Sequence, residues 1–184
     1  MDALQQVKHY TYADYLTWGD EVRCELIDGV PFLLAAPTPE HQAISMELSG
    51  QLWQFLKGKP CKVYTAPFDV RLNAAEGDDT VVQPDISVIC DQVKTDNNKG
   101  CVGVPDMVVE ILSPSTAGKD CIIKLRKYLR AGVREYWLVD PDSRIVNTHV
   151  LKEGQYVINV YTNGDAIPVF VLDGLTINIS DIFA

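Results

Sequence analysis

Three short, mainly apolar runs in the middle of the chain constrain its fold most. They are Ile86–Cys90, Met107–Leu112 and Glu135–Val139. Each is too short for a typical helix and is bounded by turn residues, which is the pattern of buried strands. A helix-like segment, 117–131, separates the last two runs and is followed by Gly132, a residue type preferred just after helices. This order of strand, helix and strand predicts a mixed α/β fold, with helices packed on a mixed β-sheet.

The flanking regions favour hairpins and one long helix. Asp28–Gly29 lies between two apolar runs, so a hairpin is predicted over 25–36. Apolar residues at helical spacing predict a helix over 40–57. The other expected elements are a helix over 12–18 capped by Thr11, strands within 61–72, a connection over 91–103, and strands over 145–150, 156–161 and 168–179. Because no repeat or linker divides the chain, we expect one domain over residues 1–184, with extra hairpins at both ends.

Charge and cysteine content limit the classes of function. The net charge of −9 and the pI of about 4.7 exclude the broad basic surface of proteins that coat nucleic acid. Acids gathered around a metal also make a protein acidic, so a nuclease stays compatible with this charge. The chain has no apolar run of membrane-spanning length and no signal-peptide pattern, so a cytoplasmic protein without a membrane partner is expected. The five cysteines form no CxxC pair, which favours reduced thiols over a zinc site.

Two acids lie at the ends of buried runs, where a carboxylate needs a partner. Asp85 follows Pro84 at the start of one run, and Glu110 lies near the end of MVVEIL. A buried carboxylate is paired, protonated or bound to a metal, because leaving it alone is costly. If the two strands are neighbours, the acids meet at one edge of the sheet. They would then offer the hard oxygen ligands that Mg²⁺ or Mn²⁺ prefers.

The helix that follows carries a candidate catalytic lysine. Lys124 lies beside the apolar stripe of this helix, and Asp120, four residues earlier, shares its face. A lysine near metal-bound acids can orient the attacking water and offset charge in the transition state. Structural explanations stay open for each residue: Asp85 as a turn cap, Glu110 in an ion pair with a helix lysine, and Lys124 as an ordinary surface lysine.

Four segments resemble a known family. QPDISVI, GVPDMVVEILSPST, KDCIIKLRKYLRAGVREYWLVDP and ISDIFA are similar to the Uma-type family of restriction endonucleases, which is abundant in cyanobacteria. The resemblance covers most of the chain, from Tyr12 to Phe183. It implies the restriction-endonuclease-like core of the PD-(D/E)xK nucleases. It also implies a Mg²⁺- or Mn²⁺-dependent endonuclease whose substrate is nucleic acid, with DNA as the expected substrate. The resemblance further implies that the protein acts as a homodimer.

The resemblance also assigns roles to residues. Asp85 supplies the aspartate of the PD motif, Glu110 the second acid, and the main-chain carbonyl of Ile111 a third metal ligand. The motif lysine is missing, because Leu112 occupies its position. Some members of the superfamily carry this lysine on the next helix, which makes Lys124 the first candidate.

Three further residues are secondary candidates. Lys119 is the second choice for the displaced lysine, and Asp120 is its neighbour. His41, near the start of the long helix, is a candidate for contact with a metal ligand or with substrate, although a capping or packing role is equally compatible. Glu25 and Asp69 fall in family-like motifs but receive no role beyond structure.

Two classes of function follow from these residues. The first is a metal-dependent endonuclease that uses Asp85, Glu110 and Lys124. The second is a catalytically inactive nucleic-acid-binding or protein-interaction module on the same fold, which the replacement of the motif lysine by Leu112 favours. A small-molecule hydrolase has no supporting motif, because GxSxG, P-loop and dinucleotide-binding patterns are all missing from the sequence.

Overall fold

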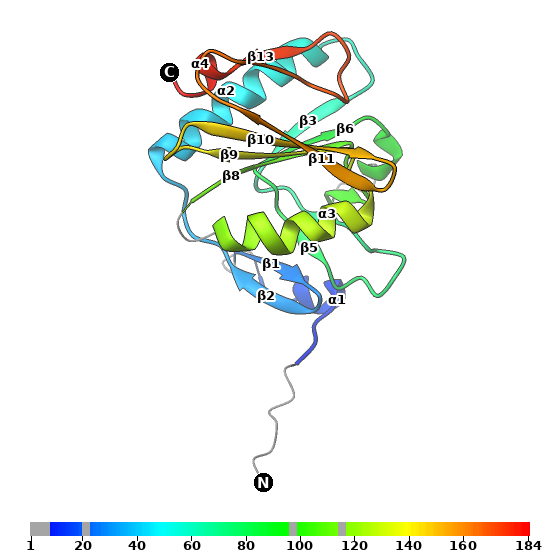
Figure 1. The fold of residues 1–184 in the computed structure, drawn as a ribbon. Helices are drawn as coiled ribbons and strands as arrows, with labels where there is room; N and C mark the ends of the chain where they lie inside the picture. Colours follow the sequence, from blue (N-terminus) through cyan, green and yellow to red (C-terminus); the bar gives the residue numbers. More distant parts are fainter. Residues whose placement is uncertain (1–7, 20–22, 96–98, 114–116) are drawn as a thin grey trace.

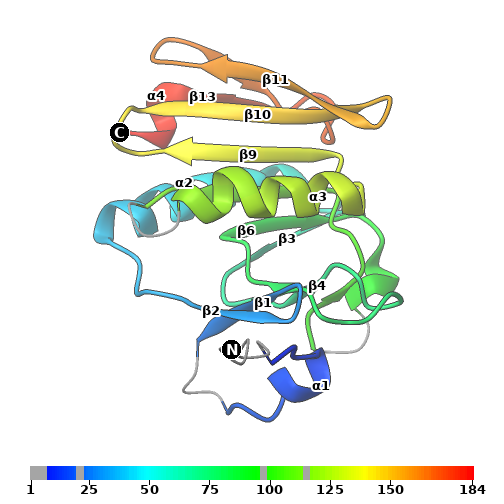
Figure 2. The same cartoon turned by 60° about the horizontal axis from the view of Figure 1, so that its bottom comes forward.

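The computed structural model describes residues 8–19, 23–95, 99–113 and 117–184. Figure 1 and Figure 2 show a layered arrangement around a central twisted sheet. The long helix α2 (Pro39–Leu56) lies on one face of this sheet, and α3 (Leu125–Ala131) lies on the other. A second, smaller sheet lies beyond α3, so that α3 is placed between the two sheets. The predicted mixed α/β fold, with helices flanking mixed sheets, is confirmed.

The central sheet has six strands in the order β11-β10-β9-β8-β6-β3 among the described residues. Their bounds are β3 Lys62–Thr65, β6 Ile86–Ile89, β8 Met107–Ile111, β9 Glu135–Asp140, β10 Ile145–Lys152 and β11 Gln155–Tyr161. The β8–β9 pair is parallel and the other pairs are antiparallel. The three apolar runs of the sequence are therefore the adjacent interior strands β6, β8 and β9. The expected pairing of the two acid-bearing strands is present, with Ile86 opposite Val109.

The smaller sheet has the order β2-β1-β5-β4-β7. Its strands are β1 Cys24–Ile27, β2 Val30–Leu33, β4 Val70–Arg71, β5 Val81–Val82 and β7 Cys101–Val102. The predicted N-terminal hairpin is present and turns at Asp28–Gly29, where φ is +50° and +73°. These positive angles are typical of the two-residue turns that join strands with a right-handed twist. The expected connection over 91–103 contains β7 and a 3₁₀ turn at Gln92–Thr95.

The predicted long helix is confirmed. α2 begins after Thr38, whose hydroxyl accepts the N–H of His41 at 3.2 Å. Its buried face consists of Ile44, Leu48, Leu52 and Leu56. The first helix, α1 (Tyr12–Tyr15), is shorter than the predicted 12–18. It is held at its start by Asp14, which accepts the N–H of Thr11 at 2.9 Å.

Two predicted elements differ from the structure. The helix expected over 117–131 is present, but its middle is a π-helical segment, Lys119–Lys124, and it continues as α3 from Leu125. The strand expected over 168–179 is wrong for most of its length, because the chain turns at Asp173–Gly174, where Gly174 has φ of +83°. The C-terminal elements are β12 (Ala166–Pro168), β13 (Thr176–Asn178) and the short helix α4 (Ile179–Ile182).

The structure also tests the predictions for the core aromatic residues and for the cysteines. Tyr136 and Trp137 are fully buried, as predicted for core residues. The expectation of reduced thiols is wrong for Cys61 and Cys90, which form a disulfide in the structure. They meet because the antiparallel pairing of β3 and β6 places Lys62 opposite Ile89, and the two cysteines are the next pair along. Within the described ranges, none of the helices combines the length and the apolar character needed to span a bilayer.

Candidate functional site

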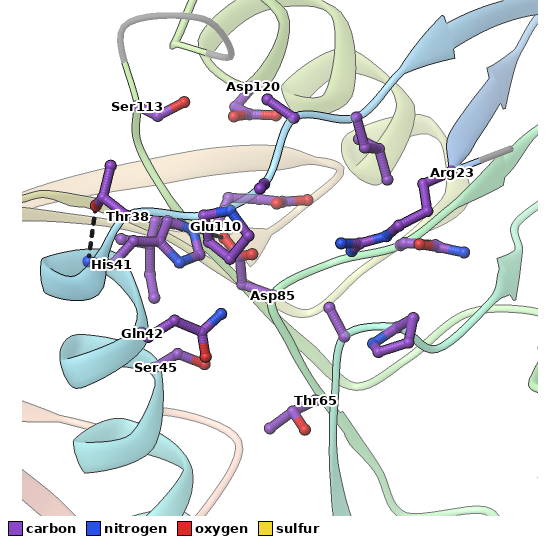
Figure 3. Close-up of a pocket in the computed structure, with 18 of the residues that line it drawn as sticks. Arg23, Thr38, His41, Gln42, Ser45, Thr65, Asp85, Glu110, Ser113 and Asp120 are labelled. Atoms are coloured by element: carbon purple, nitrogen blue, oxygen red, sulfur yellow. Dashed lines mark hydrogen bonds and ion pairs between the residues drawn. The ribbon is translucent and has the colours of Figure 1, made fainter. Parts of the chain in front are cut away.

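A cavity of about 780 Å³ lies beside the first turns of α2, the start of β6, the end of β8 and the π-helical segment (Figure 3). The candidate residues chosen from the sequence all line it: His41, Asp85, Glu110, Ile111, Lys119, Asp120 and Lys124. The topology explains this meeting, because β6 and β8 are antiparallel neighbours, so that the start of one strand lies beside the end of the other. The site is therefore built from four segments that are distant in sequence.

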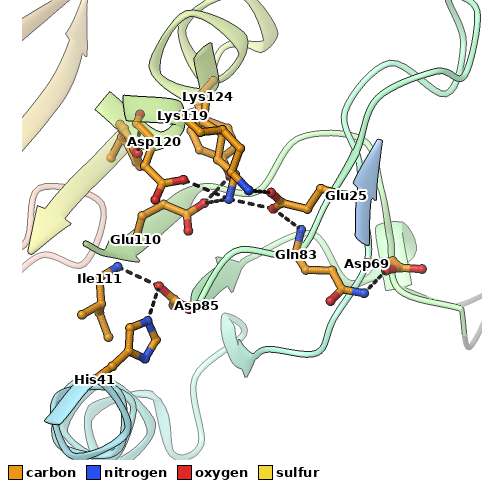
Figure 4. Close-up of polar contacts among 12 residues, drawn as sticks. Glu25, His41, Asp69, Gln83, Asp85, Glu110, Ile111, Lys119, Asp120 and Lys124 are labelled. Atoms are coloured by element: carbon orange, nitrogen blue, oxygen red, sulfur yellow. Dashed lines mark hydrogen bonds and ion pairs between the residues drawn. The ribbon is translucent and has the colours of Figure 1, made fainter. Parts of the chain in front are cut away.

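Asp85 joins three elements. Its Oδ2 atom accepts the main-chain N–H of Ile111 at 2.7 Å and lies 3.2 Å from Nε2 of His41 (Figure 4). These bonds run from the start of β6 to the end of β8 and to the first turn of α2. Asp85 therefore has a position set by the tertiary fold, in contrast to the local turn cap that was an alternative from sequence.

His41 lies at the start of α2 with its side chain toward Asp85. A carboxylate only accepts hydrogen bonds, so Nε2 is the protonated nitrogen in this contact. The bond to Asp85 raises the pKa of His41, burial lowers it, and the charge of Asp85 raises it further. His41 therefore lies in the first turn of α2 and directly contacts Asp85, the candidate metal ligand.

Glu110 is buried, with 3% of the residue exposed. Its Oε1 atom accepts hydrogen bonds from Nζ of Lys124 at 2.8 Å and from the hydroxyl of Tyr128 at 2.7 Å. The ion pair with a helix lysine, which the sequence left as an alternative, is therefore present. Burial raises the pKa of Glu110 well above its usual range, and the nearby acids Asp120 and Asp85 add to this effect while Lys124 opposes it.

Lys124 is an interior residue, 2% exposed, and the surface-lysine alternative is wrong. Its Nζ atom lies 2.8 Å from Glu110, 2.7 Å from Glu25 and 3.3 Å from Asp120. Burial alone would lower the pKa of Lys124, but these three carboxylates raise it well above its usual value. Lys124 is therefore a cation at neutral pH.

Glu25 is the site residue that the sequence did not reveal. It is fully buried on β1, and its two carboxylate oxygens bind both lysines, Lys119 at 2.6 Å and Lys124 at 2.7 Å (Figure 4). Oε1 also accepts the main-chain N–H of Gln83 at 2.9 Å. Burial would raise the pKa of Glu25, but Lys124 and Lys119 lower it below its usual value. The available signal was an acid inside the apolar stretch CELI, every residue of which is buried.

The π-helical segment explains how two lysines reach one carboxylate. Lys119 and Lys124 are five residues apart, and in an α-helix such residues point about 140° away from each other. In a π-helix, whose hydrogen bonds join residues five apart, such residues come to the same side of the helix. Local widening of the helix over 119–124 therefore places both ammonium groups at Glu25.

Leu112 shows why the motif lysine is displaced. It lies two residues after Glu110, and residues two apart along a strand point to the same face of the sheet. Leu112 packs with the hydrophobic cluster that contains Tyr128 and Tyr136. Lys124 approaches Glu110 from the helix that covers this face. Its ammonium group thus contacts the same carboxylate that a lysine at position 112 would neighbour.

The charge balance of the site is negative. Glu25, Asp85, Glu110 and Asp120 lie near Lys119 and Lys124. The pKa of Glu110 is raised first by its burial and then by the other three acids. Within the described residues, no three His, Cys, Asp or Glu side chains form a ready metal cluster. Asp85 and Glu110 both line the cavity, and carboxylates, main-chain carbonyls and water are the oxygen ligands that Mg²⁺ uses in proteins.

The chain is similar to known proteins in sequence and in fold. A family model described as "Uma2: Putative restriction endonuclease" matches residues 12–180. Two proteins of Synechocystis sp. (strain ATCC 27184 / PCC 6803 / Kazusa) are similar in sequence. "Uncharacterized protein slr1290" is 27% identical over 158 residues, covering 84% of this chain and 81% of the relative. "Uncharacterized protein sll1609" is 29% identical over 144 residues, covering 76% and 80%.

A solved structure shares the fold. It is the crystal structure of "a putative nuclease belonging to DUF820" from Anabaena variabilis ATCC 29413. It has a TM-score of 0.78 and 22% sequence identity, and the match covers 94% of this chain and 97% of that chain. The restriction-endonuclease-like architecture expected from the sequence is thereby confirmed.

Proposed function

Because the chain belongs to the Uma2 family of restriction-endonuclease-like proteins, we propose that it is a Mg²⁺- or Mn²⁺-dependent endonuclease. It would hydrolyse phosphodiester bonds in nucleic acid, with DNA as the expected substrate. The observation that carries the proposal is the convergence of Asp85 and Glu110, from neighbouring strands, on one cavity with two lysines. The family description supports nuclease activity. The metal and the choice of DNA are our inference.

We propose that Asp85, Glu110 and the main-chain carbonyl of Ile111 hold the metal. Burial raises the pKa of Glu110, and the neighbouring acids Asp120, Asp85 and Glu25 raise it further against the effect of Lys124. A divalent cation would offset the repulsion among these acids. When bound, the metal would polarise the phosphoryl oxygens and activate water. His41 would keep Asp85 oriented through the oxygen that it contacts at 3.2 Å.

The two lysines would have separate roles. Because three carboxylates keep Lys124 charged, it would donate hydrogen bonds to the attacking water or to the developing charge, and it would not accept a proton. Lys119, whose side chain is 11% exposed, lines the cavity and is bonded to Glu25. It is placed to meet a substrate phosphate. Asp120 would hold Lys124 in position at 3.3 Å.

The rest of the cavity lining supports a nucleic-acid substrate. Beside Arg23 and the candidate residues, it includes the uncharged hydroxyl and amide groups of Thr38, Gln42, Ser45, Ser49 and Thr65. Figure 3 shows Thr38, Gln42, Ser45 and Thr65 around the cavity. Such groups, together with arginine and lysine, are the usual partners of phosphate and sugar oxygens, and they fix a strand without reading its sequence. The α2 residues among them follow the face of the helix that begins at His41.

An inactive binding module is the second candidate. The specific observation in its favour is that Oε1 of Glu110 is already bonded to Lys124 and Tyr128, as in a closed structural ion pair. Leu112 in place of the motif lysine points the same way. In this case binding of nucleic acid would survive EDTA and the Asp85→Ala change.

A substrate panel separates the two candidates. Single-stranded DNA, duplex DNA, supercoiled plasmid and RNA are incubated with the protein and Mg²⁺, Mn²⁺ or EDTA. The nuclease proposal predicts metal-dependent cleavage of at least one substrate, with loss of cleavage in Asp85→Ala and Glu110→Ala. Binding without cleavage under every metal condition would favour the inactive module. We also infer a homodimeric assembly, with the edge strand β11 as the candidate contact surface.

A further inference from the structure

The two edges of the six-stranded sheet differ. One edge is β3, which is four residues long, carries the exposed Lys62 and packs against α2. Short length, a charged residue and a covering helix are common ways to protect an edge strand. The other edge, β11, is seven residues long and contains neither a charged residue nor a proline. Among the described residues, no strand pairs with its outer side.

The backbone groups on the outer side of β11 can be assigned. Leu151 of β10 stands opposite Tyr156 and donates its N–H to Arg134, at 2.9 Å, on the side away from β11. Antiparallel partners alternate between pairs whose backbone groups face each other and pairs whose groups face away. Tyr156 therefore directs its N–H and C=O to the open edge. The alternation gives the same direction to Ile158 and Val160.

The side chains at this edge are apolar and exposed. Ile158 is 57% exposed and Val160 is 59% exposed, on the sheet face that also carries Tyr156. Val157, on the opposite face, is 44% exposed. In a chain with a net charge of −9, this strip is free of charge over 155–161. Two identical acidic molecules would meet here with less repulsion than at a charged surface.

We propose that β11 is the strand by which two copies of this chain associate, in antiparallel fashion, about a two-fold axis at Ile158. In this register, each of the three residues whose N–H and C=O face the open edge stands opposite a partner residue whose N–H and C=O also face that edge. Ile158 meets the partner's Ile158, and Tyr156 meets the partner's Val160. Registers centred on Val157 or Asn159 would leave one of the three without such a match. Aromatic and β-branched residues in opposite positions also stabilise antiparallel pairs.

A second copy is the occupant that this geometry fits best. The contact is isologous, so each strand supplies both the donors and the acceptors that its symmetry mate needs. The two sheets would continue into one another and remove both exposed edges. β9 and β10 separate β11 from β8, so each copy keeps its candidate site complete. The assembly can therefore be tested without metal or substrate, and its failure would leave the nuclease proposal standing.

The test is the mass in solution by size-exclusion chromatography with light scattering. The wild type is expected at twice the chain mass of 20.5 kDa. Ile158→Lys, which places two lysines opposite each other on the axis, is expected at the mass of one chain. The matched control is Leu33→Lys, because Leu33 is 81% exposed on the edge strand β2 of the other sheet. It is expected to stay dimeric. Circular dichroism establishes that both variants fold, and Val160→Lys replaces Ile158→Lys if the latter does not.

Mixing two variants tests the register. Ile158→Glu alone is expected to be monomeric, as is Ile158→Lys. Mixed in equal amounts, they are expected to form a species of dimer mass, because a lysine then faces a glutamate across the axis. A monomeric wild type, or a dimeric Ile158→Lys, would overturn the proposal. A mixture that stays monomeric would overturn the axis at Ile158.

Discussion

Nζ of Lys124 lies 2.8 Å from Oε1 of Glu110, inside the protein, and the two residues come from a π-helical segment and from the strand that this segment covers. The ion pair places a permanent positive charge beside the acid that the PD-(D/E)xK resemblance assigns to the metal. It also supplies from the helix the ammonium group that the strand lacks at Leu112. Stability and function are therefore expected to depend on the same contacts.

Replacing Lys124 by Met is predicted to destabilise the protein strongly. Methionine keeps much of the volume but leaves Glu25, Glu110 and Asp120 without their shared cation. Removing one partner of a buried pair typically costs about 3–5 kcal/mol. The measurement is the free energy of unfolding in urea. Lys152→Met is the control, because Lys152 is exposed and is expected to change little. Equal stabilities of the two variants would show that the buried ion pair is not important for the fold.

Glu25→Gln tests the residue that binds both lysines. The amide keeps the shape and one acceptor for the N–H of Gln83, but it removes the charge between Lys119 and Lys124. Hydrogen bonds to charged groups contribute about 1.5–3 kcal/mol, so a loss of this order is predicted. Thermal unfolding of Glu25→Gln is compared with that of Glu76→Gln, an exposed glutamate. If both have the wild-type midpoint, Glu25 does not hold the lysines in place.

Local patterns in the sequence were sufficient for the main elements and for part of the site. The apolar runs over 86–90, 107–112 and 135–139 became neighbouring strands, and the helical spacing from Ile44 to Leu56 became the buried face of α2. Asp85 and Glu110 could be paired because each sits at the end of such a run. These predictions depend on periodicity and on the cost of burying charge, both of which are local properties.

The rest depends on contacts that are distant in sequence. Glu25 and Lys119 are 94 residues apart, and only the packing of the smaller sheet against the helix layer brings them together. The π-helical segment Lys119–Lys124 has no local signal in the sequence, and both of its terminal lysines contact the distant Glu25. The disulfide between Cys61 and Cys90 required the β3–β6 register. The strand predicted over 168–179 failed because its apolar residues pack around a turn at Gly174.

His149 gives a prediction of pH dependence. It is 4% exposed on β10, its Nδ1 lies 3.3 Å from the carbonyl of Tyr136, and the rings of Tyr136 and Tyr156 face it. Burial lowers the pKa of His149 below its usual value. Below about pH 6.5 the unfolded chain therefore takes up a proton that the folded chain resists, and stability falls as the pH falls.

The comparison uses His149→Gln, which cannot titrate. Urea unfolding of the wild type and of the variant is measured at pH 7.5 and at pH 5.5. The wild type is predicted to lose more stability than the variant between these two values, by at most about 1.4 kcal/mol for each unit of difference in pKa between the folded and unfolded states. Parallel losses in both proteins would place the acid sensitivity elsewhere.

The most direct test of the account is a calorimetric titration of Mn²⁺ into the wild type, Asp85→Asn and Asp142→Asn. Asp142 is exposed in the turn after β9 and controls for the loss of one negative charge. A metal site that includes Asp85 predicts binding of one equivalent by the wild type and by Asp142→Asn, and a loss of at least about tenfold in affinity for Asp85→Asn. No binding by the wild type, or equal binding by all three proteins, would contradict a metal site at the ends of β6 and β8.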